Sequence, residues 1–148
     1  MLIGITQRND CNRYGDYVDS LENSYLDYLT RFGISVVVLP NSLAQVNSYL
    51  ETFCFHGFIL SGGNDINPQQ LGNSSINGLS ISEKRDQVES AILKFAIDRK
   101  VPVLGICRGM QFINAHFGGD IQFNINSSAS SSEALVGRRI FHAPTFGN

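Results

Sequence analysis

Four short apolar runs recur along the chain, separated by segments whose apolar residues return at helical spacing. The runs are residues 2–6 (LIGIT), 34–40 (ISVVVLP), 57–63 (GFILSGG) and 101–106 (VPVLGI). The second run is almost entirely apolar and β-branched, which is typical of a parallel strand covered on both faces. We therefore predict four strands, each followed by a helix.

The segments between these runs predict the helices. The first helix is expected to begin near Asp19 or Ser20 and to end at Gly33, and the second to run from Ser42 to about Phe53. The apolar face of the first helix is predicted to comprise Leu21, Tyr25, Tyr28, Leu29 and Phe32.

Two later helices have local start and stop signals. Ser80 and Glu83 have the spacing of a capping box, so the third helix is expected to begin there. The fourth helix, residues 108–117, is expected to end at Gly118 and Gly119. The predicted buried residues of the third helix are Val88, Ile92, Leu93 and either Phe95 or Ala96. Strand alternating with helix four times predicts a doubly wound α/β fold with a mostly parallel sheet.

Size and charge narrow the function classes. The 148 residues are 43% hydrophobic with a net charge of −2, which suits one globular domain without a nucleic-acid or anionic-membrane partner. No apolar run approaches the roughly 18 residues that span a bilayer, and the N-terminus lacks a signal-peptide pattern. Cys11, Cys54 and Cys107 are too dispersed for a zinc site or a disulfide framework, which indicates a cytoplasmic location.

The segment Gly105-Ile106-Cys107-Arg108-Gly109 joins the fourth predicted strand directly to the fourth helix. Glycines on both sides of Cys107 allow a sharp turn in which larger side chains would collide. Such a turn lifts Cys107 to the carboxyl edge of the sheet and to a helix N-terminus, which favours a thiolate. The Arg108 amide would face an oxyanion formed at the attacked carbon. We interpret Cys107 as a nucleophile; the alternative is a cysteine that packs as a small apolar residue.

A glycine pair, Gly62-Gly63, ends the third predicted strand and therefore lies at the same edge of the sheet. Backbone amides without side-chain obstruction suit the second half of an oxyanion hole. The alternative is a simple turn in which Asn64 and Asp65 are the turn-forming residues.

Together these motifs resemble a known family. "SGGNDINP", followed by "KRDQVESAILKFAIDRKVPVLGICRGMQFINAHFGGDI", is similar to the class I glutamine amidotransferase superfamily. The similarity is closest to its γ-glutamyl hydrolase branch, which includes γ-glutamyl-GABA hydrolase and the capsule-pathway hydrolase of γ-glutamyl-CDP-amidate. It covers residues 2–121 of the single domain 1–148. It implies a flavodoxin-like sheet, a Cys-His-Glu triad and attack on the amide of a small γ-glutamyl substrate, without metal or organic cofactor.

The resemblance also implies individual roles. Cys107 matches the nucleophile, Gly62 or Gly63 and the Arg108 amide match the oxyanion donors, and Gln111 matches a position that holds the glutamyl group. The implied reaction forms a glutamyl thioester, which water then hydrolyses to release glutamate. A recurrent acidic and basic pattern before the fourth strand is expected to be structural, with an ion pair four residues apart on the helix. That pattern comprises Arg85, Asp86 and Glu89.

The end of the sequence departs from the family pattern, whose histidine and acidic partner come from a downstream His-x-Glu segment. His142 is followed by Ala143 and Pro144, while His116 and His56 are expected to be structural. We therefore expect the domain to be partial, without its C-terminal strands, and with a sheet edge open to self-association or a partner chain. Three functions stay open: a γ-glutamyl amide hydrolase, a glutaminase domain that supplies ammonia to a synthetase partner, and a non-catalytic binding domain.

Overall fold

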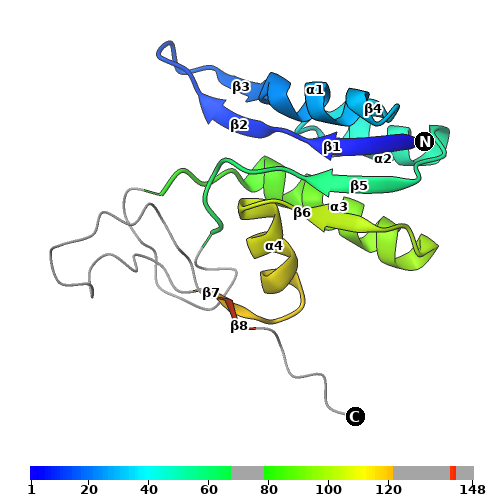
Figure 1. Ribbon diagram of the computed structural model, residues 1–148. Coiled ribbons are helices and arrows are strands. Elements are labelled where there is room, and N and C mark those ends of the chain that lie inside the picture. Colours follow the sequence, from blue (N-terminus) through cyan, green and yellow to red (C-terminus); the bar gives the residue numbers. More distant parts are fainter. Residues whose placement is uncertain (68–78, 122–140, 143–148) are drawn as a thin grey trace, which may run out of the picture.

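Four parallel strands form the central sheet of the computed structural model, in the order β4-β1-β5-β6 (Figure 1). The structure describes residues 1–67, 79–121 and 141–142, with residues 141 and 142 described by their backbone alone. The strands are β1 (Leu2–Thr6), β4 (Ser35–Leu39), β5 (Gly57–Leu60) and β6 (Val103–Gly105). All four predicted strands are confirmed, and their order is that of a flavodoxin-like sheet.

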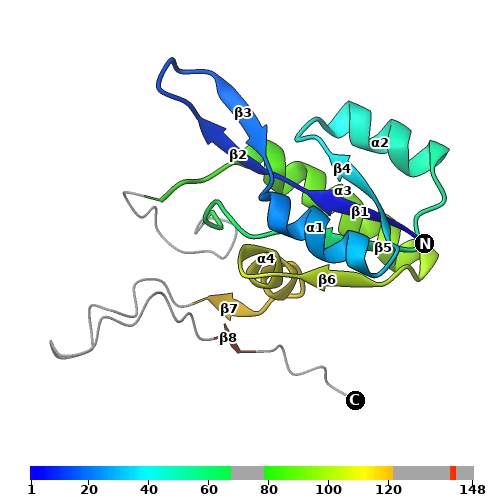
Figure 2. The same ribbon diagram turned by 45° about the horizontal axis from the view of Figure 1, so that its top comes forward.

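Helices cover both faces of the sheet, as Figures 1 and 2 show. They are α1 (Asn23–Arg31), α2 (Leu43–Thr52), α3 (Glu83–Arg99) and α4 (Arg108–His116). On one face α2 and α3 enclose the larger apolar cluster, to which α4 adds Phe112. Its α3 residues are those predicted, with Ala96 rather than Phe95 fully buried: Val88, Ile92, Leu93 and Ala96. On the other face α1 covers a smaller cluster of Ile3, Ile5, Leu29 and Ile59.

A β-hairpin lies between β1 and the first helix and includes the position at which we predicted that helix to start. Strand β2 (Arg8–Cys11) pairs antiparallel with β3 (Tyr17–Ser20), and α1 begins only at Asn23. The prediction of a helix from residue 19 or 20 is therefore wrong. Its physical reason is that the Asp19 carboxylate accepts hydrogen bonds from Asn9 and Asn41 instead of capping a helix.

The capping box predicted for α3 is also wrong by two residues. Ser82 is the N-cap, and its hydroxyl accepts the Arg85 amide at 3.3 Å. Ser80 instead pairs with Asp65 through hydrogen bonds in both directions. The glycine stop signals are confirmed, because Gly33 and Gly118 follow the ends of α1 and α4 with φ values of 66° and 80°.

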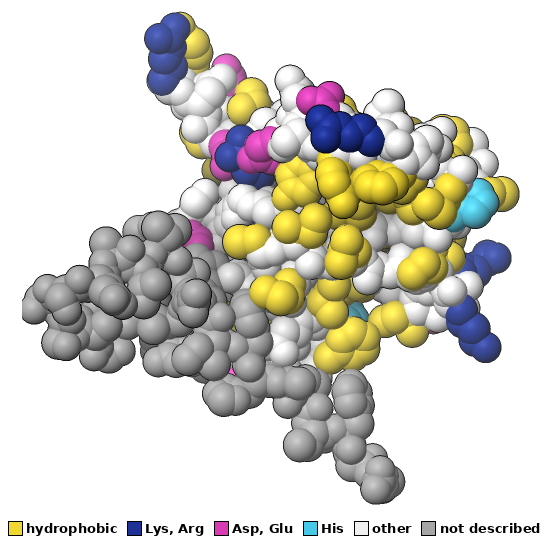
Figure 3. All heavy atoms as spheres, viewed as in Figure 1, with side chains coloured by type: hydrophobic (Ala, Val, Ile, Leu, Met, Phe, Trp, Pro, Cys, Tyr) yellow, Lys and Arg dark blue, Asp and Glu magenta, His cyan; other side chains and the backbone are white. Residues whose placement is uncertain are grey.

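The sheet edges are less covered than the pattern predicted. Strand β4 is an edge strand in which only Leu39 is buried, so the prediction of cover on both faces is wrong there, whereas all of β5 is buried. Leu104 of β6 is 57% exposed although its register partner Ile59 is buried under α1. Figure 3 shows hydrophobic side chains gathered over the area of α1, the sheet and α4.

A short antiparallel pair, β7 (Asp120–Ile121) and β8 (Phe141–His142), follows α4. The serine-rich stretch at residues 127–132 and most of the polar stretch after Asn64 lie outside the described residues. Within the described part of the chain, no helix has the length and apolar character needed to cross a bilayer.

Candidate functional site

Cys107 lies where β6 turns into α4, at the carboxyl edge of the sheet. It is the N-cap of α4, its backbone has φ 52° and ψ −107°, and its side chain is exposed. A positive φ in a non-glycine residue costs free energy and persists only where the surroundings enforce it. The structure therefore holds a solvent-accessible thiol on a strained turn at the positive end of a helix dipole.

Close backbone packing enforces this turn. A Cβ on Gly105 would lie 2.5–2.7 Å from backbone atoms of Met110 and Gly109, and a Cβ on Gly109 would lie 2.0 Å from the Leu60 carbonyl oxygen. The steric reason predicted for the two glycines is thus confirmed. It follows that α4 starts directly against the end of β5, next to the Gly62-Gly63 turn.

The Gly62-Gly63 turn comes close to Cys107. A Cβ placed on Gly62 would lie 3.7 Å from Cβ of Cys107 and 3.5 Å from the hydroxyl of Tyr25. The Gly62 amide donates to that Tyr25 hydroxyl at 3.3 Å. Gly63 has φ 102° and lies against the side-chain stem of Arg8. The two predicted glycines and the cysteine are therefore brought together, with Tyr25 as an unpredicted neighbour.

Arg85 of α3 binds the backbone carbonyls of this turn. Its guanidinium donates to the carbonyls of Ser61 and Gly62, at 2.7 and 2.8 Å. In a trans peptide the N–H points away from the C=O, so these bonds direct the amides of Gly62 and Gly63 away from α3. Burial lowers the pKa of Arg85, a shift that the Glu89 carboxylate opposes, and the guanidinium stays charged.

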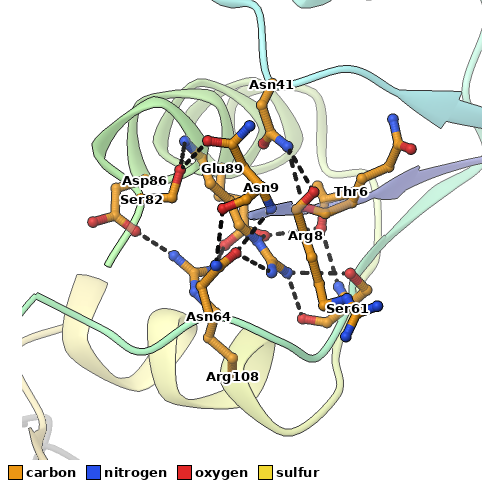
Figure 4. Close-up of polar contacts among 12 residues, drawn as sticks. Thr6, Arg8, Asn9, Asn41, Ser61, Asn64, Ser82, Asp86, Glu89 and Arg108 are labelled. Atoms are coloured by element: carbon orange, nitrogen blue, oxygen red, sulfur yellow. Dashed lines mark hydrogen bonds and ion pairs between the residues drawn. The ribbon is translucent and has the colours of Figure 1, made fainter. Parts of the chain in front are cut away.

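Arg85 belongs to a group of four ionised side chains, here called the buried ion cluster, that links α3 to the start of α4. The cluster comprises Arg85, Asp86, Glu89 and Arg108, each at most 3% exposed. Glu89 accepts from Arg85 at 2.9 Å, as the i, i+4 spacing predicted, and from Thr6 at 2.8 Å. Arg108 pairs with both Glu89 and Asp86 (Figure 4). The Arg108 side chain therefore has a structural partner set that the sequence did not indicate.

The hairpin is fastened to the same turn by side-chain amides. The Asn64 side chain accepts from the Asn9 amide and donates to the Asn9 carbonyl, both at 3.0 Å (Figure 4). The side chain of Asn9 in turn donates a hydrogen bond to the Asp19 carboxylate and accepts one from the Ser82 hydroxyl. Asn64 is buried and thus bridges two segments rather than only forming a turn.

A second group of charges, here called the surface ion cluster, lies beside Gly63. Arg8 is 3.7 Å from Asp10 and 3.4 Å from Glu22, and these three side chains are 37–46% exposed. The Arg8 stem packs against Gly63, whose Cβ would approach it to 2.1 Å. A glycine is required at position 63 for this packing as well as for its positive φ.

The remaining predicted residues lie around the turn or away from it. Gln111 is 2% exposed, one turn into α4, and its backbone N–H donates to the Cys107 carbonyl. His56 accepts the Leu2 amide at the amino edge of the sheet, and His116 is exposed in the last turn of α4. Neither histidine therefore lies where it could act on Cys107. The described residues also contain no group of three metal-ligating side chains.

This geometry defines a class: α/β proteins with a cysteine on a strand-to-helix elbow beside a glycine turn. The chain matches the family model described as Peptidase C26 over residues 1–142. It therefore belongs to the peptidase C26, or glutamine amidotransferase-like, family, as the resemblance of its motifs implied.

Individual relatives match a large part of the chain. A glutamine amidotransferase-like protein of Rickettsia prowazekii is 34% identical over 128 residues, 81% of this chain and 44% of the relative. The γ-glutamyl-CDP-amidate hydrolase of Campylobacter jejuni is 35% identical over 125 residues, 82% of this chain and 58% of the relative. The γ-glutamyl-γ-aminobutyrate hydrolase of Escherichia coli O157:H7 is 27% identical over 110 residues, 72% and 42% of the two chains. The chain thus spans about half the length of these relatives.

Proposed function

We propose that this chain supplies the nucleophile of an enzyme that hydrolyses the amide bond of a small γ-glutamyl compound. The observation that carries the proposal is Cys107, whose exposed thiol sits on a turn with φ 52° at the N-terminus of α4, beside Gly62. Strain at such a position is retained at functional sites, because it orients the reacting group. Two of the relatives are hydrolases of γ-glutamyl compounds by name, which supports this substrate class.

The proposed reaction has two steps. The Cys107 thiol gives up its proton, the thiolate forms an S–C bond with the γ-carbonyl carbon, and the C–N bond breaks as the amine leaves with that proton. Water then adds to the thioester, the S–C bond breaks, and glutamate and the free thiol are released. The net change is amide plus water to glutamate plus amine, so the chemistry requires no metal, oxidant or organic cofactor.

The residues around the thiol suit this chemistry. The Arg108 amide lies at the start of α4, where helix amides have no intrahelical partner, and the glycine turn directs its amides away from Arg85. We propose the Arg108 amide and the Gly62-Gly63 turn as the source of the oxyanion donors, and Gln111 as a residue that holds the glutamyl group. Cys11, Cys54 and Cys107 are all free and exposed, which supports a reducing, cytoplasmic setting.

The test is labelling of the full chain with a chloroketone analogue of glutamine, followed by peptide mass spectrometry. We expect Cys107 to react far faster than Cys54, which is also exposed but lies before β5, at the amino edge of the sheet. Cys107→Ser should abolish labelling and Cys54→Ser should leave it unchanged. Equal reaction of all three cysteines would contradict an activated nucleophile.

Glutamate release then separates the three functions. Release from larger γ-glutamyl amides supports the hydrolase, whereas release from glutamine only when a synthetase is added supports the glutaminase. Labelling of Cys107 without release from any substrate supports a nucleophile that lacks its base. The described histidine side chains do not discriminate among the three functions, because His56 and His116 both lie away from Cys107.

A further inference from the structure

The hydroxyl of Tyr25 is a polar group in the candidate site to which the mechanism above gives no role. It accepts the Gly62 amide at 3.3 Å and lies 3.5 Å from the position that a Gly62 Cβ would occupy. The Cβ of Cys107 lies 3.7 Å from the same position. The hydroxyl and the cysteine therefore flank one face of Gly62 together.

The core of the protein fixes the Tyr25 ring. Tyr25 is half-buried and packs with Ile106 and Val38 against the apolar cluster that α1 covers. Ile106 is the residue immediately before Cys107 and its carbonyl lies 4.0 Å from the same Gly62 position. The packing that holds the cysteine turn thus also sets the place of the Tyr25 hydroxyl.

The direction of the Gly62 amide is fixed as well. The carbonyl of the Ser61–Gly62 peptide accepts from Arg85 at 2.7 Å, and the N–H of that trans peptide points the opposite way, to Tyr25. A hydroxyl that accepts one hydrogen bond keeps its own hydrogen for a second acceptor. Accepting from an amide polarises the hydroxyl and makes it a better donor.

Resting on the proposed function, we propose that Tyr25 is a catalytic residue whose O–H donates to the substrate carbonyl oxygen as Cys107 attacks. The oxygen gains negative charge in this step, and a fixed phenol donor beside it stabilises that charge without giving up its proton. Gly62 then acts through Tyr25, and the amides of Gly63 and Arg108 complete the set of donors. In this role the Tyr25 hydroxyl, rather than the Gly62 amide itself, donates to the oxyanion.

The test measures a tetrahedral adduct and needs no turnover. An N-acetylated γ-aldehyde analogue of glutamate, labelled with ¹³C at the aldehyde, is titrated against the full chain and its hemithioacetal is followed by NMR. We expect Tyr25→Phe to weaken adduct formation about 10-fold or more, since loss of one oxyanion donor costs that much or more. Alkylation of Cys107 by iodoacetamide should keep its rate, because that reaction develops no oxyanion. Tyr28→Phe, an exposed tyrosine on the same helix, is the matched control and should change neither.

Two results would overturn the inference. If Tyr25→Phe forms the adduct as tightly as the wild type or more tightly, the hydroxyl only occupies the Gly62 amide and is not a donor. If the wild-type chain forms no adduct that Cys107→Ser removes, the proposed function fails and Tyr25 loses its role with it. The first result leaves the nucleophile intact, so the two failures are distinguishable.

Discussion

Both ion clusters contact the same glycine turn through an arginine, yet they differ in how far solvent reaches them. In the buried ion cluster every side chain is at most 3% exposed, and Arg85 holds the Ser61 and Gly62 carbonyls. In the surface ion cluster the side chains are 37–46% exposed, and Arg8 covers Gly63 with its stem. The same residue types therefore support one loop in two physically different ways.

The difference teaches where charge fixes geometry. A buried ion loses its hydration, so each member of the buried ion cluster depends on its partners, and removal of one leaves the others uncompensated. At the surface, water replaces a lost partner and salt screens the attraction. We conclude that the buried ion cluster sets the conformation of the turn, whereas the surface ion cluster contributes mainly through packing of the Arg8 stem.

The largest effect is expected from Glu89→Gln. This change removes the carboxylate that both arginines of the cluster share, so the free energy of unfolding should fall by about 3 kcal/mol or more. Urea unfolding followed by circular dichroism measures it. Asp98→Asn, at an exposed carboxylate near the end of the same helix, is the control and should stay within about 0.5 kcal/mol. A loss below about 1 kcal/mol for Glu89→Gln would remove the contrast between the clusters.

An intermediate effect is expected from Asp19→Asn. Burial raises the pKa of Asp19, but hydrogen bonds from the backbone and side chain of Asn41 and from Asn9 outweigh it and bring the pKa below its ordinary 3.8. Replacing one acceptor oxygen should cost about 1 kcal/mol at pH 7, because solvent reaches this residue and compensates part of the loss.

The pH dependence follows from the lowered pKa of Asp19. Its stabilisation is present at pH values above 3.8 and is lost as the pH falls through the lower folded-state pKa. The unfolding free energies of wild type and Asp19→Asn should therefore converge below about pH 4. A difference that stays constant from pH 7 into this acid range would show that the carboxylate charge is irrelevant.

The smallest effect is expected from Glu22→Gln, which removes one partner of Arg8 at the surface. The free energy of unfolding should change by about 0.5 kcal/mol or less, and the change should vanish at about 1 M salt. Thermal unfolding at two salt concentrations measures both. A loss as large as that of Glu89→Gln would show that burial does not separate the clusters.

Much of the sheet could be predicted because its signals are local. Apolar periodicity located the four strands and the buried face of α3, and the glycine spacing around Cys107 located the turn, since Gly105 and Gly109 meet within five residues. The pair Arg85–Glu89 followed from helical spacing alone. These features depend on residues that are neighbours in sequence.

The hairpin and Tyr25 could not be predicted because their contacts join distant segments. Residues 8–20 are mostly polar, and what holds them is the pairing of Asn9 with Asn64 and of Asp19 with Asn41. The spacing of α1 correctly brought Leu29 into the core, but Tyr28 and Phe32 on the same predicted face are 60% and 64% exposed. Nothing in that spacing distinguishes the Tyr25 hydroxyl, whose proposed role depends on where α1 meets the end of β5.

The positive φ of Cys107 lowers the stability of the folded protein. A positive φ is easy for glycine and costs other residues about 1–3 kcal/mol. Glycine would therefore be the most stabilising residue at position 107. The substitution that relieves the strain, Cys107→Gly, would at the same time remove the thiol. On the proposed function, this loss of stability is what the chain gives up to hold the Cys107 thiol at the turn.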